Sequence, residues 1–349
     1  MIDKTSQSAT PEVGPGPEAG PMSSRQAGYL VRVAARAPSL HNTQPWRFRE
    51  LEDAIELYAD HSRQLRTDPI ARELLISCGA ALYGLRLAVR SLGRTPEVEL
   101  FPEPRRRPTE PARFRLLARV RLGGPAPITS DERRMLEAVP HRHTHRGPFE
   151  PAPLPAGLLA GLQHDATSEG ATLAVVDLDH PGRAWAATMA TSSRGQDLDP
   201  ASQAEIHEIQ RWTREAGSQA RDGVPAHAFG AQPGRSPGRL PQRDFDLGRG
   251  LGMLAAGGPS AATGVLVTAD DCEQDWLRAG QALNRLLLHA ASQWVFARLQ
   301  TQPLQAGTIR ALIGSRLALP GVPQMLLEFG VARTAHPTAR RPAADLTGV

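Results

Sequence analysis

The sequence predicts an α+β protein in which helices and strands are mixed. Long segments carry apolar residues at helical spacing, and short segments between them alternate apolar and polar residues as strands do. The regular strand–helix–strand succession that favours a doubly wound sheet does not appear in the sequence. With 349 residues, 40% of them hydrophobic, the chain suits one large domain or two fused halves around a packed core.

The first half opens with a helix followed by a hairpin. Residues 24–37 (SRQAGYLVRVAARA) have apolar residues at helical spacing, and Pro38 ends this helix. Residues 46–51 and 55–60 (WRFREL and IELYAD) are typical of two short strands. We expect these two strands to pair as a hairpin.

A long helix and two further strands complete the first half. Asp68 is the expected N-cap of this helix, with Pro69 at its first position, and the helix runs to about Leu92. Residues 98–101 and 114–122 alternate like strands, and a loop rich in Pro and Arg separates them.

The second half begins near residue 131. Its expected elements are helices at 131–139 and 155–164, a strand at 172–178, helices near 182–191 and 200–215, a strand at 264–271, a helix at about 272–299 and a strand at 324–332. Residues 216–249 are rich in Gly, Pro and Arg and show little periodicity. A stretch of this length inside a compact protein usually has a function, and we interpret it as a lid.

Composition narrows the class of function. The net charge is +4 and the basic residues are scattered, so nucleic-acid binding is not expected. Cys78 and Cys272 are the only cysteines, which fits a reducing compartment without a disulfide framework. Residues 1–22 read as a disordered tail, and no stretch approaches the ~20 apolar residues of a membrane span. We therefore expect a cytoplasmic protein without membrane or nucleic-acid partners.

The segment APSLHNTQPWRF concentrates hydrogen-bonding side chains. Ser39, His41, Asn42 and Gln44 lie between a helix and a strand, where they could contact a polar planar ligand. A simple capping turn is the alternative interpretation. The residues alone leave both interpretations open.

A second polar segment, HRHTHRGPF, has the residue types of an anion site. The spacing of Arg142, Thr144 and Arg146 can bring two guanidinium groups and a hydroxyl to one phosphate. A solvated basic loop is the alternative. The interpretation as an anion site predicts a phosphate-bearing ligand.

The same segment also suggests a metal site, because three histidines alternate in it. On a strand, His141, His143 and His145 would share one face, and histidine is a common metal ligand. No Cys, Asp or Glu accompanies them nearby, and the two arginines repel a cation. We therefore expect no metal.

The first polar segment carries a family resemblance. APSLHNTQPW resembles the Pro-Ser-x-x-Asn-x-Gln-Pro-Trp signature of the nitroreductase superfamily, in the form with His before Asn that its Acg-like branch carries. In that superfamily the Ser and the Asn contact FMN. The resemblance implies this role for Ser39 and Asn42, with His41 and Gln44 as further cofactor contacts.

Two arginine-containing segments extend the resemblance to the cofactor phosphate. The spacing of Arg142, Thr144 and Arg146 is similar to the superfamily's Arg-x-Ser/Thr-x-Arg element, which grips the FMN phosphate. The PTARRP segment near the C-terminus is similar to the family's ending, where a basic residue returns to that phosphate. The resemblance implies a phosphate contact from Arg340, with Arg341 as a second candidate.

Other segments resemble the superfamily with one departure. RDGVPAHAFG resembles the lid of the Acg-like branch, which implies that His227 and Phe229 approach the flavin or substrate. The GQAL spelling within the last long helix is similar to the superfamily's central helix under the flavin. Where relatives usually continue with Gly-Leu, this chain has Gln-Trp-Val, so Trp294 either fills space near the pocket or is a repacked core residue.

The resemblance covers about residues 25–342 and implies the nitroreductase fold. Two fused halves, 23–130 and 131–349, would form an internal pseudo-dimer that binds one FMN, so that a monomer suffices and a homodimer is equally compatible. The implied activity is hydride transfer between NAD(P)H and a small electron-poor acceptor, namely a nitroaromatic, a quinone or a natural product. An FMN storage or sequestering protein with an occluded flavin, a biosynthetic flavin dehydrogenase and a non-catalytic small-molecule binder are alternatives. No catalytic side chain is assigned.

Overall fold

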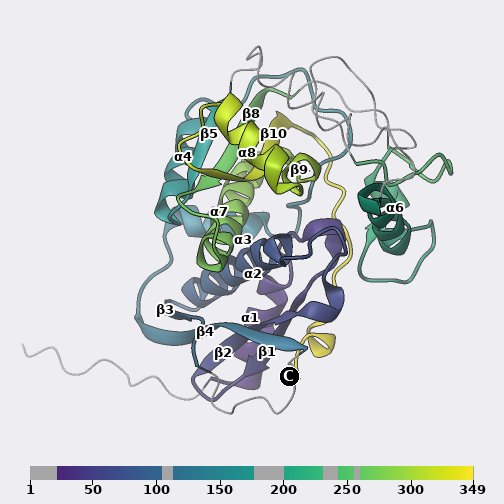
Figure 1. Ribbon diagram of the computed structural model, residues 1–349. Coiled ribbons are helices and arrows are strands. Elements are labelled where there is room, and N and C mark those ends of the chain that lie inside the picture. Colours follow the sequence, from purple (N-terminus) through teal and green to yellow (C-terminus); the bar gives the residue numbers. More distant parts are fainter. Residues whose placement is uncertain (1–21, 104–112, 177–199, 231–242, 255–259, 349) are drawn as a thin grey trace, which may run out of the picture.

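A computed structural model describes residues 22–103, 113–176, 200–230, 243–254 and 260–348 (Figure 1). Three expectations from the sequence fall mainly on other residues. These are the tail, the Pro- and Arg-rich loop between the third and fourth strands, and the helix near 182–191. Of the tail, only Met22 is described: it is buried, and its backbone N–H donates to the Glu52 carbonyl (2.9 Å).

The first half contains two helices and one antiparallel sheet. Its elements are α1 (Ser24–Ala34), β1 (Trp46–Glu50), β2 (Ala54–Asp60), α2 (Arg72–Ser91), β3 (Arg94–Leu100) and β4 (Phe114–Pro125). The four strands pair in the order β1-β2-β4-β3, and every pair is antiparallel. The hairpin and both later strands predicted from alternation are confirmed.

The second half repeats this plan with additional helices. Its elements are α3 (Ser130–Ala138), α4 (Leu158–Ser168), β5 (Thr172–Val176), α6 (Pro200–Trp212), β6 (Thr213–Arg214), β7 (Val224–Pro225), β8 (Ala262–Thr268), α7 (Glu273–Ser292), β9 (Val295–Gln300), α8 (Gly307–Arg316) and β10 (Val322–Val331). Antiparallel strands pair in the order β5-β8-β10-β9, whereas the short β6 and β7 are parallel. The α+β class is confirmed; the interpretation of the halves as a pseudo-dimer stays a prediction.

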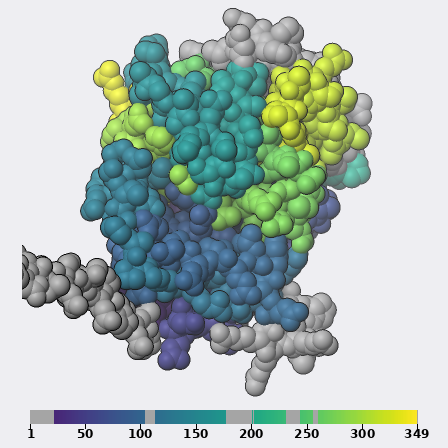
Figure 2. Space-filling view, turned by 90° about the vertical axis from the view of Figure 1, so that its left-hand side faces the viewer, coloured from purple at the N-terminus to yellow at the C-terminus, as the bar shows by residue number. Residues whose placement is uncertain are grey.

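The two 20-residue helices, α2 and α7, lie side by side between the two sheets (Figure 1). In the space-filling view the first half forms the lower part of the molecule and most of the second half the upper part (Figure 2). α2 is long and apolar enough to cross a membrane by length and composition, but 83% of that window is buried inside the structure. It therefore forms the core of the molecule together with α7.

Two glycines allow α2 and α7 to cross closely. A Cβ atom at Gly280 of α7 would overlap the Ile76 carbonyl oxygen of α2, and a Cβ atom at Gly79 of α2 would overlap the Leu277 carbonyl oxygen of α7. Asn284 adds a buried hydrogen bond between the helices, from its Nδ2 to the Ala80 carbonyl (2.7 Å). The crossing is thus set by backbone contact.

Several predicted helix boundaries are wrong: the helices predicted at 24–37, 155–164 and 200–215 are Ser24–Ala34, Leu158–Ser168 and Pro200–Trp212. Two further boundaries differ for a clear physical reason. The last long helix ends at Ser292, and Val295–Gln300 is strand β9, because Trp294 has a left-handed backbone (φ 58°) that ends the helix before β9 pairs with β10. At the other boundary, α2 begins at Arg72. Asp68 still caps it, but from four residues before the helix, where its carboxylate accepts the Leu74 N–H (2.9 Å).

The C-terminal segment returns to the first half. After β10 it runs along the molecule to the edge of the first sheet (Figure 1), where the Phe48 N–H donates to the Leu346 carbonyl (2.8 Å). This path brings Arg340 beside the end of α1, since its guanidinium donates to the Ala37 carbonyl (3.0 Å). Residues that are about 300 positions apart therefore meet at one place.

We expect Gly280→Ala to destabilise the fold by about 1–3 kcal/mol, because overpacking the helix crossing outweighs the gain of about 1 kcal/mol in helix propensity. Gly124→Ala is the matched control, since a Cβ atom at Gly124 meets nothing within 4 Å. Denaturant titration of both variants measures the free energy of unfolding. Equal stability of the two variants would contradict the proposed backbone contact.

Candidate functional site

A cavity of about 830 Å³, its open mouth included, lies between the two halves. The first half supplies the loop after α1 and the start of α2. The second half supplies the segment between α3 and α4, the end of β9 and the side of α7. Apolar side chains from both long helices and from β10 form part of its wall, namely Ile76, Leu283 and Met325. Most of the other lining residues are polar or charged, so the cavity combines an apolar surface with many hydrogen-bonding groups. Concave sites of this kind bind small molecules.

The loop after α1 is held in an unusual conformation. His41, Asn42 and Gln44 all have left-handed backbone angles (φ 50°, 56° and 50°). Such angles are uncommon for residues other than glycine and persist where the surroundings impose them. Here the Ser39 hydroxyl accepts the Gln44 N–H (2.9 Å), which closes the loop around the His41 side chain.

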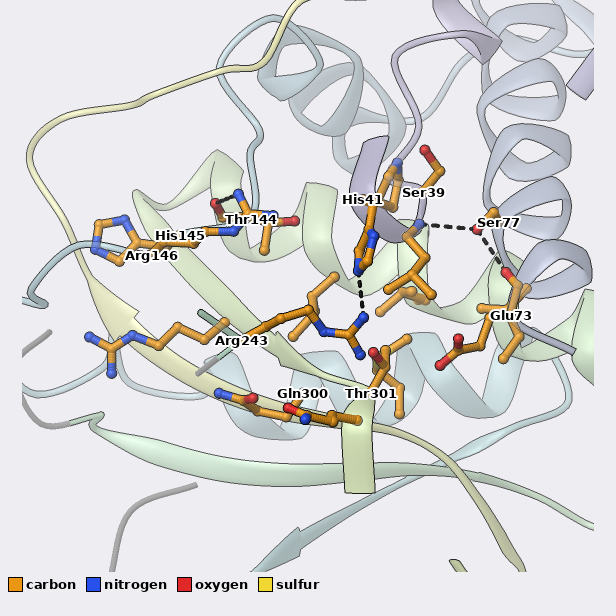
Figure 3. A pocket seen from close by; sticks show the side chains of 18 of the residues that line it. Ser39, His41, Glu73, Ser77, Thr144, His145, Arg146, Arg243, Gln300 and Thr301 are labelled. Atoms are coloured by element: carbon orange, nitrogen blue, oxygen red, sulfur yellow. Dashed lines mark hydrogen bonds between the residues drawn. The ribbon is translucent and has the colours of Figure 1, made fainter. Parts of the chain in front are cut away.

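The predicted contacts from this loop divide into two groups. Ser39 and His41 line the cavity, as Figure 3 shows. The Asn42 amide instead donates to the carbonyls of Gly223 (2.9 Å) and Ala339 (3.1 Å). The Gln44 side chain, fully buried, likewise binds backbone of the lid region and of the C-terminal segment. Both amides join remote segments, and the buried Asn42 Oδ1 accepts no hydrogen bond from the described residues.

Three predicted phosphate contacts form a cluster of cations. Arg142 is buried and Arg146 and Arg340 are partly buried, and no described carboxylate lies within ion-pair distance of any of them. Burial, and secondarily neighbouring guanidinium groups, lowers the pKa of Arg142 and of Arg146 to about 10 and lowers the pKa of Arg340 well below its ordinary value. Mutually repelling cations create a strong demand for an anion.

The hydrogen bonds of this cluster leave donors free. Arg142 Nη2 donates to the Arg36 carbonyl (3.0 Å) just after α1, while its buried Nη1 has no partner among the described residues. The buried Nε of Arg340 is likewise without a described partner. Thr144 and Arg146 line the cavity, and Arg340 is close enough to Arg142 and Arg146 for their charges to lower its pKa. A phosphate would satisfy both charge and hydrogen bonds there.

Arg341 belongs to a different group of charges. Its Nη2 donates to the Asp345 carbonyl (2.9 Å), and burial followed by Arg63 and Arg47 lowers its pKa to about 10. Its backbone N–H donates to Gln44 Oε1 (2.8 Å). The adjacent arginines of the C-terminal segment are thus directed to separate places, and Arg340 alone lies beside Arg142.

The three alternating histidines pack against aromatic rings. His141 stacks on Trp294 with ring centroids 5.2 Å apart, and His143 lies against Phe296 with centroids 4.4 Å apart. Burial is the main cause that lowers the pKa of His143 to about 3 and that of His145 to about 4, so both are neutral at pH 7. Among the residues that the structure describes, no group of three or more His, Cys, Asp or Glu side chains is placed to hold a metal ion.

The lid region contributes two residues to the cavity, but not those expected. Arg243 and Phe245 line it, whereas His227 is exposed and Phe229 is buried against Phe245 (centroids 5.9 Å apart) outside the lining. Trp294 is 48% exposed and is also absent from the lining. The sequence RDF at residues 243–245 was the available signal for Arg243.

Arg243 and His41 point toward each other in the cavity (Figure 3), and Arg243 Nη1 donates to His41 Nε2. Because a guanidinium cannot accept this bond, the His41 proton resides on Nδ1. Burial, then Arg243 and Arg146, lowers the pKa of His41 well below its usual range. His41 is therefore a neutral donor, and its buried Nδ1 has no partner among the described residues.

Comparison with known proteins identifies the class. No family model matches the chain. It is 32% identical over 329 residues to "Putative NAD(P)H nitroreductase Rv3131" of Mycobacterium tuberculosis, covering 92% of this chain and 89% of the relative. The chain therefore belongs to the nitroreductase family, as its motifs predict. Within that family it is also 29% identical over 324 residues to "Putative NAD(P)H nitroreductase acg" of the same organism, covering 90% of this chain and 93% of the relative.

Solved nitroreductases give weaker structural matches. One, with bound FMN, from Desulfitobacterium hafniense, has a TM-score of 0.40 at 14% identity and covers 62% of this chain and 98% of its own. Another, from Anabaena variabilis, has a TM-score of 0.48 at 11% identity and covers 88% of each chain. Family membership therefore rests on the sequence relatives.

We expect inorganic phosphate to raise the Tm of the flavin-free protein, because phosphate binds the arginine cluster in the folded state only. At a phosphate concentration of a hundred times the Kd, the free energy of unfolding rises by about 2.7 kcal/mol. Arg340→Met should lose most of this rise, while Arg121→Met, at an exposed ion pair with Asp53, should keep it. Thermal unfolding at matched ionic strength, with chloride in place of phosphate, measures the difference. A rise of the same size in all three proteins would show that phosphate acts elsewhere.

Proposed function

We propose that this chain is an FMN-dependent oxidoreductase that transfers hydride between NAD(P)H and a small electron-poor acceptor. The observation that carries the proposal is the cluster of Arg142, Arg146 and Arg340, which has no described carboxylate partner and adjoins, through Arg146, a cavity with both apolar and polar walls. FMN combines a phosphate dianion with a planar ring system, so its chemistry matches both parts of the site. The curated relatives, named as NAD(P)H nitroreductases, support the same assignment.

The residues present fit this cofactor. Arg142, Arg146 and Arg340, with the Thr144 hydroxyl, would hold the phosphate. Arg142 Nη1 and Arg340 Nε are buried donors without a described partner, and Thr144 and Arg146 line the cavity. Ser39 and His41 would contact the ring system from the opposite loop. When bound, FMN supplies the hydride chemistry, and the protein supplies orientation and electrostatics.

The side chains around the ring have separate tasks in this proposal. The neutral His41 would donate from Nδ1 to an electron-rich atom without adding a full charge. Ile76, Leu283 and Met325 would exclude water from the reacting groups. A dry, preorganised site strengthens each hydrogen bond within it. The proposed acceptors are a nitroaromatic, a quinone or a natural product, all of which take up hydride together with a proton.

Storage or sequestration of FMN is the second candidate, and one observation favours it. Arg243 and Phe245 come from the lid region and form part of the cavity wall, with the Arg146 guanidinium over the Phe245 ring (5.3 Å to its centroid). A wall built in this way restricts the approach of a nicotinamide. The two candidates differ in whether NAD(P)H reaches the flavin.

We expect one FMN per chain bound by a monomer, because the two groups of cofactor contacts come from the two halves of a single polypeptide. Gel filtration with light scattering, combined with flavin absorbance, measures mass and stoichiometry together. Arg142→Met should elute at the same mass with most of its flavin lost, since it removes a buried phosphate donor. Flavin found only in dimeric fractions would contradict the single-chain site.

Anaerobic mixing with NADH or NADPH distinguishes reductase from storage protein. For a reductase we expect rapid bleaching of the flavin absorbance by at least one nicotinamide. If only dithionite bleaches the wild type, the mixing is repeated with Arg243→Ala, which removes a lid side chain from the cavity. Arg211→Ala, which alters an exposed arginine of α6, is the control. Bleaching gained in Arg243→Ala alone supports storage, and none in any variant overturns hydride transfer from NAD(P)H.

A further inference from the structure

Glu73, in the first turn of α2, is a buried carboxyl group in the wall of the cavity. Its side chain is 4% exposed, and Figure 3 shows it beside Ser77 on the same helix. It also lines an adjoining second cavity of about 190 Å³, its open mouth included, which Arg63 and Gln64 line as well. Since those two side chains are only partly buried, the second cavity lies near the surface. Glu73 thus separates the cofactor cavity from a region close to solvent.

The hydrogen bonds of Glu73 leave it without a strong ion pair. Gln305 Nε2 donates to its Oε2 (3.0 Å), and Arg72 Nη2 lies 3.4 Å from its Oε1. The other Arg72 amino group is already bound to Gln324, through the backbone carbonyl (3.0 Å) and the side-chain oxygen (3.1 Å). A buried carboxyl with one weak cationic contact favours its protonated form.

Glu73 is connected to the rest of the cavity through the lid arginine. Gln305, which donates to Glu73, accepts from Arg243 Nη2 (3.3 Å), and Arg243 in turn donates to His41. A chain of hydrogen bonds from Glu73 through Gln305 and Arg243 to His41 therefore joins α2, the segment before α8, the lid and the loop after α1. This chain of hydrogen bonds holds the carboxyl group in place along one wall.

We propose that Glu73 is a catalytic acid, which donates its proton to the reduced acceptor in the main cavity and recovers one from water through the second cavity. The inference rests on the proposed function and assigns it the proton donor that the sequence left unknown. With a quinone, the acceptor gains a hydride from reduced FMN, and the resulting oxyanion takes the Glu73 proton: the carboxyl O–H bond breaks and a phenolic O–H bond forms. Water then returns a proton to the carboxylate.

The charges around Glu73 agree with this role. The groups that face it are Arg72 and Asp68 from the start of α2, Arg243 from the lid, Arg310 from α8 and the neutral His41. Burial raises the pKa of Glu73 to about 7; Arg72 and Arg243 oppose this rise, and Asp68 adds to it. The carboxyl group is therefore protonated below about pH 7 and ionised above it. A general acid works best with its pKa near the working pH.

Infrared difference spectroscopy of the flavin-free protein tests the protonation of Glu73 independently of cofactor and activity. We expect a protonated-carboxyl band that titrates near pH 7 in the wild type and is missing in Glu73→Gln. Glu56→Gln is the matched control: Glu56 is equally buried but is paired with Arg119 (2.8 Å) in the first sheet. This control should retain the band. A wild type without such a band overturns the proposal even if the protein binds FMN.

Rapid-mixing kinetics of the flavin-loaded enzyme tests the proton transfer itself. Oxidation of the reduced enzyme by a benzoquinone should slow as pH rises through about 7 in the wild type. In Glu73→Gln the rate of this oxidation should fall by up to roughly 10²-fold and should no longer depend on pH in this range. The rate of flavin reduction by NAD(P)H should be unchanged. If Glu73→Gln loses its flavin, Glu73→Asp is the second variant. It should oxidise more slowly than the wild type but keep the pH dependence. An unchanged profile in Glu73→Gln overturns the role, whereas failure to bind FMN counts only against the proposed function.

Discussion

The backbone contact between α2 and α7 is the constraint on which the rest of the structure depends. With glycine at both crossing positions, the two helices approach until carbonyl groups of one lie against the backbone of the other. This distance fixes how far apart the two sheets lie. It also fixes the cavity, because α2 presents Glu73, Ile76 and Ser77 to it and α7 presents Leu283. A wider crossing would separate these side chains, since protein interiors are close-packed.

The arginine cluster is held by segments far apart in sequence. Arg142 follows α3, Arg340 lies near the C-terminus, and both donate to carbonyl oxygens just after α1. Burying unpaired guanidinium groups costs free energy that packing elsewhere must offset. An anion bound at this cluster removes that cost. The folded state and the phosphate-bearing ligand are therefore thermodynamically linked, and the C-terminal segment is as much a part of the site as the motif near its beginning.

Local patterns were sufficient for most elements and for part of the site. The hairpin of β1 and β2 and the strand β8 follow from alternation and hydrophobic runs, which are properties of neighbouring residues. Strand β9 was missed because VFARLQ continues an apolar helical run, and the left-handed conformation of Trp294 that ends the helix has no sequence signal. The resemblance assigned Arg142 and Arg340 to one phosphate site, and the structure brings both to the carbonyls just after α1; their contact with FMN stays a prediction. It implied that Phe229 approaches the flavin or substrate, but Phe229 does not line the cavity, since side-chain direction depends on tertiary packing.

Glu73 could not be assigned from the sequence, because its chemistry is entirely non-local. In the pattern it is one polar residue at the start of an apolar helix, where an acidic residue usually interacts favourably with the helix N-terminus. Its protonation depends on Gln305 and Arg243, which are more than 160 residues away and reach it only through the fold. Arg243 therefore has two effects at once: it forms part of the cavity wall, and its positive charge opposes protonation of the acid inside. The shape of the cavity and the supply of a proton are thus coupled through one side chain.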